Sequence, residues 1–146
     1  MKVSTKGRYG LRVMIELALR HGQGPVMMDT IARCTDVSRK YLYNLLTGLK
    51  TAGLVRATRG AGGGFELTRE PAAINVEQVI RVLEGPLDLV DCTAGDAACE
   101  RQQHCVARGV WIEMGRALQQ VMTGLDLQQL ADRQRAKTEE PPMYYI

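Results

Sequence analysis

The sequence predicts a mainly α-helical fold with a small β-wing, in which a winged helix-turn-helix domain precedes a long C-terminal dimerisation helix. Hydrophobic residues make up 45% of the 146 residues but aromatic residues only 5%, so the core must be aliphatic, which favours helices. Two short helical segments precede a pair of strand-like segments joined by a glycine-rich link. A long apolar stripe at three- and four-residue spacing then follows towards the C-terminus.

Three helices are predicted in the first third of the chain. The first spans residues 7–21, where apolar residues recur at helical spacing. The second starts at Asp29 as its N-cap and ends at about Cys34, which we expect to be a buried packing residue. The third is capped by Ser38 and extends to Lys50.

The third helix has two faces of different character. Its apolar face is a stripe of Leu42, Leu45, Leu46 and Leu49. Its opposite face carries groups that bond to phosphates and base edges, namely Arg39, Lys40, Tyr43, Asn44 and Thr47. Two helices joined by a tight turn, with such a face on the second, are typical of helix-turn-helix DNA-binding modules. An ordinary surface helix is the alternative interpretation.

Residues 54–58 and 65–68 read as two strands that form a wing directly after this helix. Their link holds Arg59, Gly60 and Gly62, where an arginine can enter a minor groove and glycines allow close approach to a DNA backbone. A nucleotide-phosphate loop is excluded, because its last glycine would be Phe65 and the following element is a strand.

The charge distribution agrees with a polyanion-binding N-terminal half. Residues 1–70 hold 12 Lys/Arg against 5 Asp/Glu, a surplus of +7, whereas residues 71–146 hold 7 against 11, a balance of −4. Chance scatter of solvated charges is the alternative.

No run approaches the roughly 20 apolar residues of a membrane span, and no signal peptide is recognisable. We therefore expect a cytoplasmic protein with no membrane partner.

Three cysteines, Cys92, Cys99 and Cys105, lie in a short polar stretch, separated by six and five residues. In a reducing compartment such cysteines are ligands or switches rather than structural disulfides. Thiolates at this spacing suit an iron–sulfur cluster or zinc. His104 is the nearest imidazole and the candidate fourth ligand, with a solvated loop histidine as the alternative. No His/Asp pair accompanies a nucleophile, so no enzyme is predicted.

The C-terminal stripe predicts a dimer seam, because it is too long for one small domain to cover. It comprises Val106, Val110, Met114, Ala117, Leu118, Val121 and Leu125. Packing back onto the first helix is the alternative, and Trp111 is expected to pack against the domain. The predicted divisions are a DNA-binding domain (1–84), a cysteine-rich loop (85–105), dimerisation helices (106–135) and a flexible tail (136–146).

Four stretches resemble the IscR/NsrR group of Rrf-type bacterial winged-helix regulators: STKGRYGLRVMIELAL, VSRKYLYNLLTGLKTAGLV, RGAGGGFEL and the cysteine loop. The similarity covers roughly residues 1–132. It implies a homodimeric transcription factor that binds a double-stranded DNA operator under control of an iron–sulfur cluster, with cluster-assembly proteins as further partners. A 2Fe–2S cluster is expected in preference to a 4Fe–4S cluster.

The resemblance does not complete the ligand set. IscR-type relatives place a histidine three residues past the last cysteine, where this chain has Arg108, and NsrR-type relatives place an aspartate where it has Arg8. Some relatives lack the cluster cysteines and respond to other signals. The alternative function is therefore a cluster-free winged-helix repressor that depends on a thiol/disulfide switch or on zinc.

Overall fold

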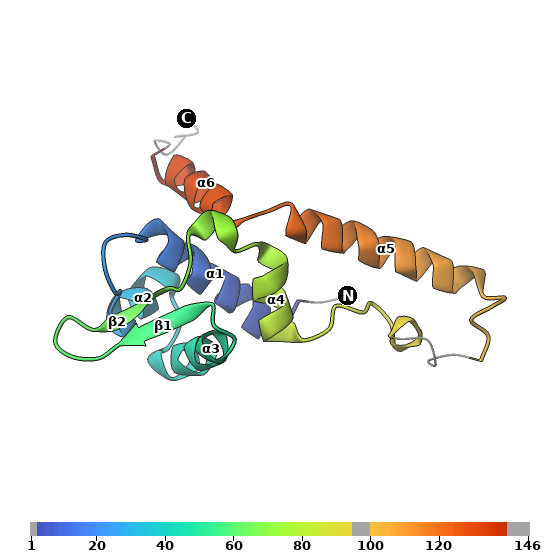
Figure 1. Cartoon of the computed structure of the whole chain (residues 1–146), viewed down its shortest axis with the longest axis horizontal. Helices are drawn as coiled ribbons and strands as arrows, with labels where there is room; N and C mark the ends of the chain where they lie inside the picture. The colour runs from blue at the N-terminus through green and yellow to red at the C-terminus, as the bar shows by residue number, and fades with distance from the viewer. Residues whose placement is uncertain (1–2, 95–99, 140–146) are drawn as a thin grey trace, which may run out of the picture.

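The computed structural model describes residues 3–94 and 100–139 and separates into two parts, which we call the head and the arm (Figure 1). The head comprises residues 3–84 and 124–139, and the arm comprises the described residues from 85 to 123. The elements in chain order are α1 (Thr5–Leu19), α2 (Met28–Thr35), α3 (Arg39–Thr51), β1 (Val55–Thr58), β2 (Gly64–Leu67), the 3₁₀ turn η1 (Pro71–Ala73), α4 (Val76–Glu84), the 3₁₀ turn η2 (Asp91–Thr93), α5 (Val106–Thr123) and α6 (Leu127–Glu139). The predicted mainly helical fold with a two-stranded wing is confirmed.

The head has one aliphatic core, to which every helix except α5 contributes. Met14 and Leu17 of α1, Ile31 of α2 and Leu127 of α6 are all almost completely buried. The leucine stripe of α3 closes the core from the other side of α1, as the sequence predicts. Since α6 packs on α1, the last helix contributes to the core of the head, and the dimer seam expected for residues 106–135 stays a prediction.

Two local expectations about α2 are wrong. Met27, not Asp29, occupies the N-cap position, and Asp29 lies in the first turn, where its carboxylate is 3.0 Å from Nε of Arg39. Cys34 is exposed rather than buried. By contrast Ser38 caps α3 as predicted, because its hydroxyl accepts a hydrogen bond from the backbone N–H of Tyr41 at 3.3 Å.

The wing is an antiparallel hairpin that is tied to the head at its base. Val55 pairs with Leu67 at the base, and both side chains are buried. Val26 and Phe65 exchange two backbone hydrogen bonds of 2.8 Å, which form an isolated antiparallel bridge between strand β2 and the segment before α2. A Cβ at Gly64 would lie 2.3 Å from the carbonyl oxygen of Val26, so this close approach requires glycine.

The arm leaves the head after α4 and returns along α5, which projects from the body in Figure 1. Leu118 and Leu125 of the predicted stripe turn inwards and pack beside Val76, Ile80 and Met122. The remaining members stay at the surface: Val106, Val110, Met114, Ala117 and Val121, which we call the α5 outer face. The helix α6 runs to Glu139, so residues 136–139 of the expected tail are helical.

Candidate DNA-binding surface and cysteine segment

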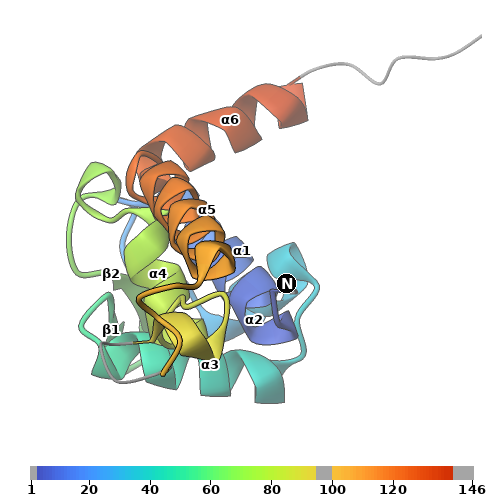
Figure 2. The same ribbon diagram turned by 90° about the vertical axis from the view of Figure 1, so that its right-hand side faces the viewer.

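The helix α3 lies on the side of the head opposite α6 (Figure 2). All five residues predicted to face DNA are exposed: Arg39, Lys40, Tyr43, Asn44 and Thr47. The cause is the helical period, since burial of the leucine stripe forces the intervening positions outward. The structure therefore brings these five predicted residues together.

Two of these five side chains already have protein partners. Arg39 is paired with Asp29, as described above, and Thr47 donates its hydroxyl to the carbonyl oxygen of Tyr43 at 2.7 Å. Within residues 3–94 and 100–139, no ion pair or side-chain hydrogen bond engages the side chains of Lys40, Tyr43 or Asn44. These three groups are therefore available to a ligand without breaking an existing contact.

The wing presents Arg59, Gly60 and Gly62 at its exposed tip. Gly60 adopts a φ of 107°, and the backbone N–H of Gly63 donates to its carbonyl at 3.0 Å, which tightens the turn. Below the tip, Nε of Arg56 lies 3.0 Å from the Glu66 carboxylate on the neighbouring strand. Arg56 is thus held within the wing, whereas Arg59 extends from it.

Sequence reasoning missed an aromatic and cationic cluster beside the start of α3. The guanidinium groups of Arg8 and Arg12 lie 5.4 and 5.3 Å from the centre of the Tyr9 ring. Tyr9 meets Tyr41 of α3 edge to face at 6.1 Å, and Arg12 donates to the carbonyl of Thr35 at 2.9 Å. Only part of the signal was present in the sequence: Arg12 follows Tyr9 by three positions on a helix, a spacing at which side chains meet, whereas adjacent residues such as Arg8 and Tyr9 do not normally face each other.

The described residues of the cysteine segment, 85–94 and 100–105, precede α5. Cys92 is in η2 and Cys105 occupies the N-cap position of α5, and both are half-buried free thiols. Arg108 donates from Nε to the carbonyl of Cys92 at 3.1 Å, which ties η2 to the first turn of the helix. Because Cys105 is the N-cap residue, its thiol lies beside the positive end of the α5 helix dipole. Its side chain makes no capping hydrogen bond.

The remaining predicted ligands are not assembled by the described residues. Cys99 lies outside them, and His104 is exposed. Within the described part of the chain, no three His, Cys, Asp or Glu side chains are close enough to hold a metal ion. The assignment of Cys92, Cys99, Cys105 and His104 as ligands therefore stays a prediction.

Cys34 lies apart from this segment, on α2. Its Sγ accepts a hydrogen bond from Nη2 of Arg20 at 3.5 Å, and Arg20 is also bound to the Glu16 carboxylate. The hydrogen bond to Glu16, and secondarily the contact with Cys34, raise the pKa of Arg20 above its ordinary value, partly offset by burial. Arg20 is therefore a permanent cation beside this thiol.

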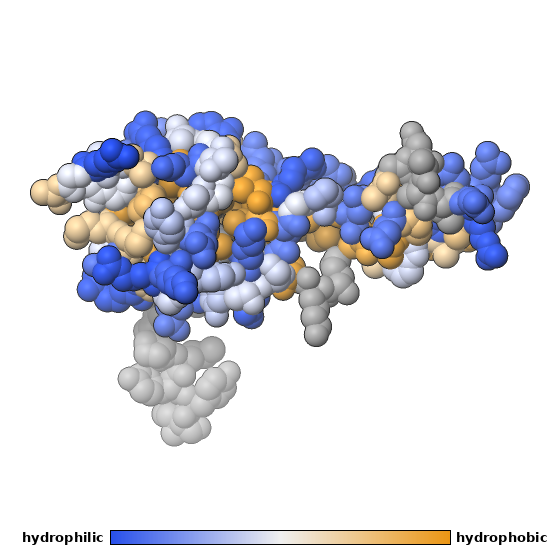
Figure 3. All heavy atoms as spheres, turned by 90° about the horizontal axis from the view of Figure 1, so that it is seen from below, coloured by the Kyte–Doolittle hydropathy of each residue, from blue (hydrophilic) through white to orange (hydrophobic). Residues whose placement is uncertain are grey.

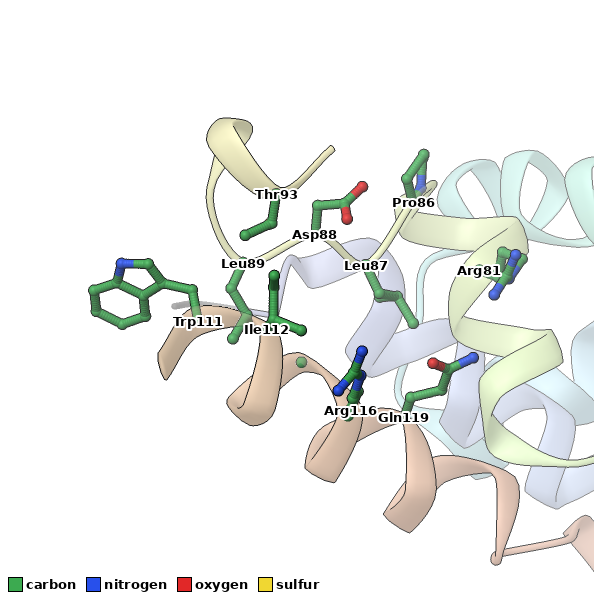
Figure 4. Close-up of a pocket in the computed structure, with 11 residues that line it drawn as sticks. Arg81, Pro86, Leu87, Asp88, Leu89, Thr93, Trp111, Ile112, Arg116 and Gln119 are labelled. Carbon is green, nitrogen blue, oxygen red and sulfur yellow. The ribbon is translucent and has the colours of Figure 1, made fainter. Parts of the chain in front are cut away.

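A cleft of about 320 Å³ separates the cysteine segment from α5 (Figure 4). Leu89 extends from the segment towards Ile112 of the helix, and Leu87 points towards the part of the helix that carries Arg116 and Gln119. Trp111 points away from this contact and is 38% exposed, so the expectation that it packs against the domain is wrong. The arm is held together by few apolar contacts and retains a large indole at its surface.

A larger groove of about 720 Å³ runs between α1, α4 and the arm, and it is mainly apolar. Its walls include Leu11 of α1, Ile80 of α4, Leu87 of the cysteine segment and Leu118 of α5. Figure 3 shows hydrophobic surface where the arm meets the head and along the arm. Among the described residues, five of the large exposed apolar side chains lie on α5 and three on the head.

An exposed polar recognition helix, a preceding helix at a tight turn and a glycine-tipped wing define the class of winged-helix DNA-binding regulators. The Rrf2 family model, described as an iron-dependent transcriptional regulator, matches residues 3–133. The chain therefore belongs to the Rrf2 family of transcriptional regulators. No helix in residues 3–94 and 100–139 is long and apolar enough to cross a membrane.

Similar proteins agree with this assignment. The HTH-type transcriptional regulator CymR of Bacillus subtilis is 41% identical over 146 residues, which span both chains completely. Its solved structure, described as that of the global cysteine regulator, has a TM-score of 0.77 and covers 91% of this chain and 98% of that one, at 42% identity. The solved structure of T. potens IscR also has a TM-score of 0.77, at 38% identity, and covers 99% and 97%. These relatives are transcriptional regulators, not enzymes.

Proposed function

We propose that this regulator binds its operator as a homodimer and that an iron–sulfur cluster held by Cys92, Cys99 and Cys105 controls its DNA affinity. The observation that carries the proposal is the position of two free, half-buried thiols: Cys105 lies at the uncapped start of α5, and Cys92 lies in η2, whose backbone is bonded to Arg108 in the first turn of α5. Soft thiolate donors beside the positive end of a helix dipole fit a cluster with a net negative charge. The iron dependence in the family description supports the same assignment.

When bound, a 2Fe–2S cluster would supply a centre that reacts with oxidants and nitric oxide, with His104 as the candidate fourth ligand. The chain's own residues provide the coupling to DNA. Cys105 is the N-cap residue of α5, and Arg108 ties the first turn of α5 to the backbone of Cys92. A change in the order of the segment would therefore change where α5 begins and how it lies against the head. In a dimer, this alters the distance between the two recognition helices.

The dimer is proposed from the two apolar surfaces of the arm. Val106, Val110, Met114 and Val121 of the α5 outer face are 86%, 49%, 48% and 61% exposed in the single chain. A soluble monomer rarely exposes such a continuous patch, and the groove beside it is open to a second copy. Two-fold pairing of these surfaces would place two copies of α3 on the half-sites of a pseudo-palindromic operator.

The test compares single-cysteine variants prepared without oxygen. Cys92→Ala, Cys99→Ala and Cys105→Ala should each lose the visible chromophore, iron and sulfide, and should change operator affinity. His104→Ala should retain less cluster than wild type. Cys34→Ala is the matched control, because this thiol lies on α2, and it should behave as wild type. If the three variants keep the wild-type spectrum, or lose it with no change in affinity, the proposal is wrong.

A cluster-free thiol or zinc switch is the second candidate, and a specific observation favours it. Arg108 stands where IscR-type relatives place a histidine ligand, and its guanidinium is already bound to the carbonyl of Cys92. The relative with 41% identity is described as a global cysteine regulator in its solved structure. A colourless protein whose operator affinity responds to a thiol oxidant, and no longer responds in Cys105→Ala, would support this candidate.

A further inference from the structure

Glu84, the last residue of α4, reaches across to the first turn of α1. One carboxylate oxygen, Oε1, accepts hydrogen bonds from the backbone N–H and the hydroxyl of Ser4, at 3.2 and 2.6 Å. The same oxygen accepts a third bond from the backbone N–H of Gly7 at 2.9 Å. Ser4 is itself the N-cap of α1, so Glu84 completes the capping of that helix from another element.

The surrounding sequence is adapted to this contact. A Cβ at Gly7 would lie 2.2 Å from Glu84 Oε1, and a Cβ at Gly10 would lie 2.1 Å from Leu83 Cδ1. Two glycines on one face of α1 therefore allow the end of α4 to approach it closely. A negative carboxylate is unfavourable at the C-terminal end of a helix and favourable at an N-terminal end. Glu84 therefore stabilises α1, at whose N-terminus its carboxylate lies, rather than α4, whose last residue it is.

This contact lies between the cysteine segment and the recognition helix. On one side, Gly85 ends α4 with a φ of 87°, and only seven residues separate Glu84 from Cys92. On the other side, Tyr9 follows Gly7 by two residues on α1 and meets Tyr41 of α3 edge to face. A displacement of the segment at residue 85 thus acts first on the carboxylate that holds the start of α1.

We propose that Glu84 is a positioning residue that transmits the state of the cysteine segment to the recognition helix through the first turn of α1. This inference rests on the proposed function, because it assumes that the state of the cysteines controls DNA affinity. Glu84 does not contact DNA or the cysteines in this role. It fixes the N-terminus of α1 in one state and releases it when the segment at residues 85–92 moves.

The test measures operator affinity in two states, anaerobically isolated protein and the same protein after iron removal with a chelator. The ratio of the two dissociation constants is the readout. A wild-type ratio of about tenfold or more is expected, in the usual range of allosteric coupling. Glu84→Ala should bring the ratio close to one, and Glu84→Gln should give an intermediate value. Glu113→Gln, a matched change at an exposed position on α5, should retain the wild-type ratio.

A purely structural role would lower affinity by the same factor in both states and leave the ratio unchanged, which would overturn this inference alone. A ratio of one in the wild type would overturn the proposed function and this inference with it. If Glu84→Ala does not fold, Ser4→Ala removes the hydroxyl that donates to Glu84 and should also lower the ratio. A wild-type ratio in both Ser4→Ala and Glu84→Gln would contradict the inference.

Discussion

The head and the arm bury their apolar residues to very different extents. In the head, Met14, Leu42 and Leu49 are completely buried, and four helices begin with a side-chain cap, at Ser4, Ser38, Asn75 and Asp126. In the arm, α5 begins without such a cap and buries only Met122. The head therefore has the features of a unit that folds by itself, whereas the arm has those of a surface completed by a partner or ligand.

The largest expected effect concerns the arm. Met114→Asp places a charge in the middle of the α5 outer face, where a dimer would bury the methionine. Each protomer would lose roughly 1.5–3 kcal/mol of apolar burial, and a two-fold dimer about twice that. Light scattering should show a monomer whose helical circular dichroism is unchanged. Gln120→Asp, on the same helix beside Arg116, should remain dimeric. An unaltered dimer in Met114→Asp would show that the seam lies elsewhere.

The next effect concerns the core of the head. Leu49→Ala removes a completely buried side chain from α3, and should lower the free energy of unfolding by about 2–5 kcal/mol. Denaturant titration of wild type and variant measures this directly. Val110→Ala shortens an exposed aliphatic side chain of the arm, and should change the stability of a dissociated protomer by no more than about 0.5 kcal/mol. Equal losses in the two variants would contradict the distinction between head and arm.

A smaller effect is expected at the wing. Arg59→Ala should weaken operator binding by about 1–3 kcal/mol and reduce its salt dependence, because the wing tip would lose its contact with the minor groove or a phosphate. Binding titrations at several salt concentrations measure both quantities. Arg133→Ala, an exposed arginine on α6 and on the far side of the head from α3, is the control. Unchanged affinity and salt slope in Arg59→Ala would place the wing away from DNA.

The smallest effect tests the uncapped start of α5. Cys105→Ser replaces a thiol at the N-cap position by a hydroxyl, which is among the best N-caps. It should stabilise the first turn by roughly 0.5–1 kcal/mol in the cluster-free protein, detectable as slower amide exchange at residues 107–108. Cys105→Ala should give no such protection. If serine and alanine behave alike, the helix start is set by other contacts.

The comparison also explains which predictions were accurate. The leucine stripe, the Ser38 cap and the paired strands depend on local period and turn chemistry, and the head confirmed them. Asp29 failed as a cap because Met27 occupies that position, which leaves Asp29 in the first turn, where it pairs with Arg39. The apolar stripe of α5 was predicted to form one surface, but its members face two different surroundings. Leu118 and Leu125 turn towards the head while Met114 and Val121 face solvent, and apolar spacing cannot separate two neighbouring partners.

The sequence by itself determined the helix-turn-helix and wing pattern, the exposed polar face of α3 and the presence of a cysteine segment before a long helix. Those features follow from the spacing of residues within one element, and spacing is a property of the chain. The tertiary structure alone decided that α6 closes the core of the head, that Tyr9 meets Tyr41, and that Glu84 caps α1. These contacts join residues from different elements, 80 positions apart for Ser4 and Glu84 and 116 for Leu19 and Arg135, and no local pattern encodes which distant partner a side chain meets.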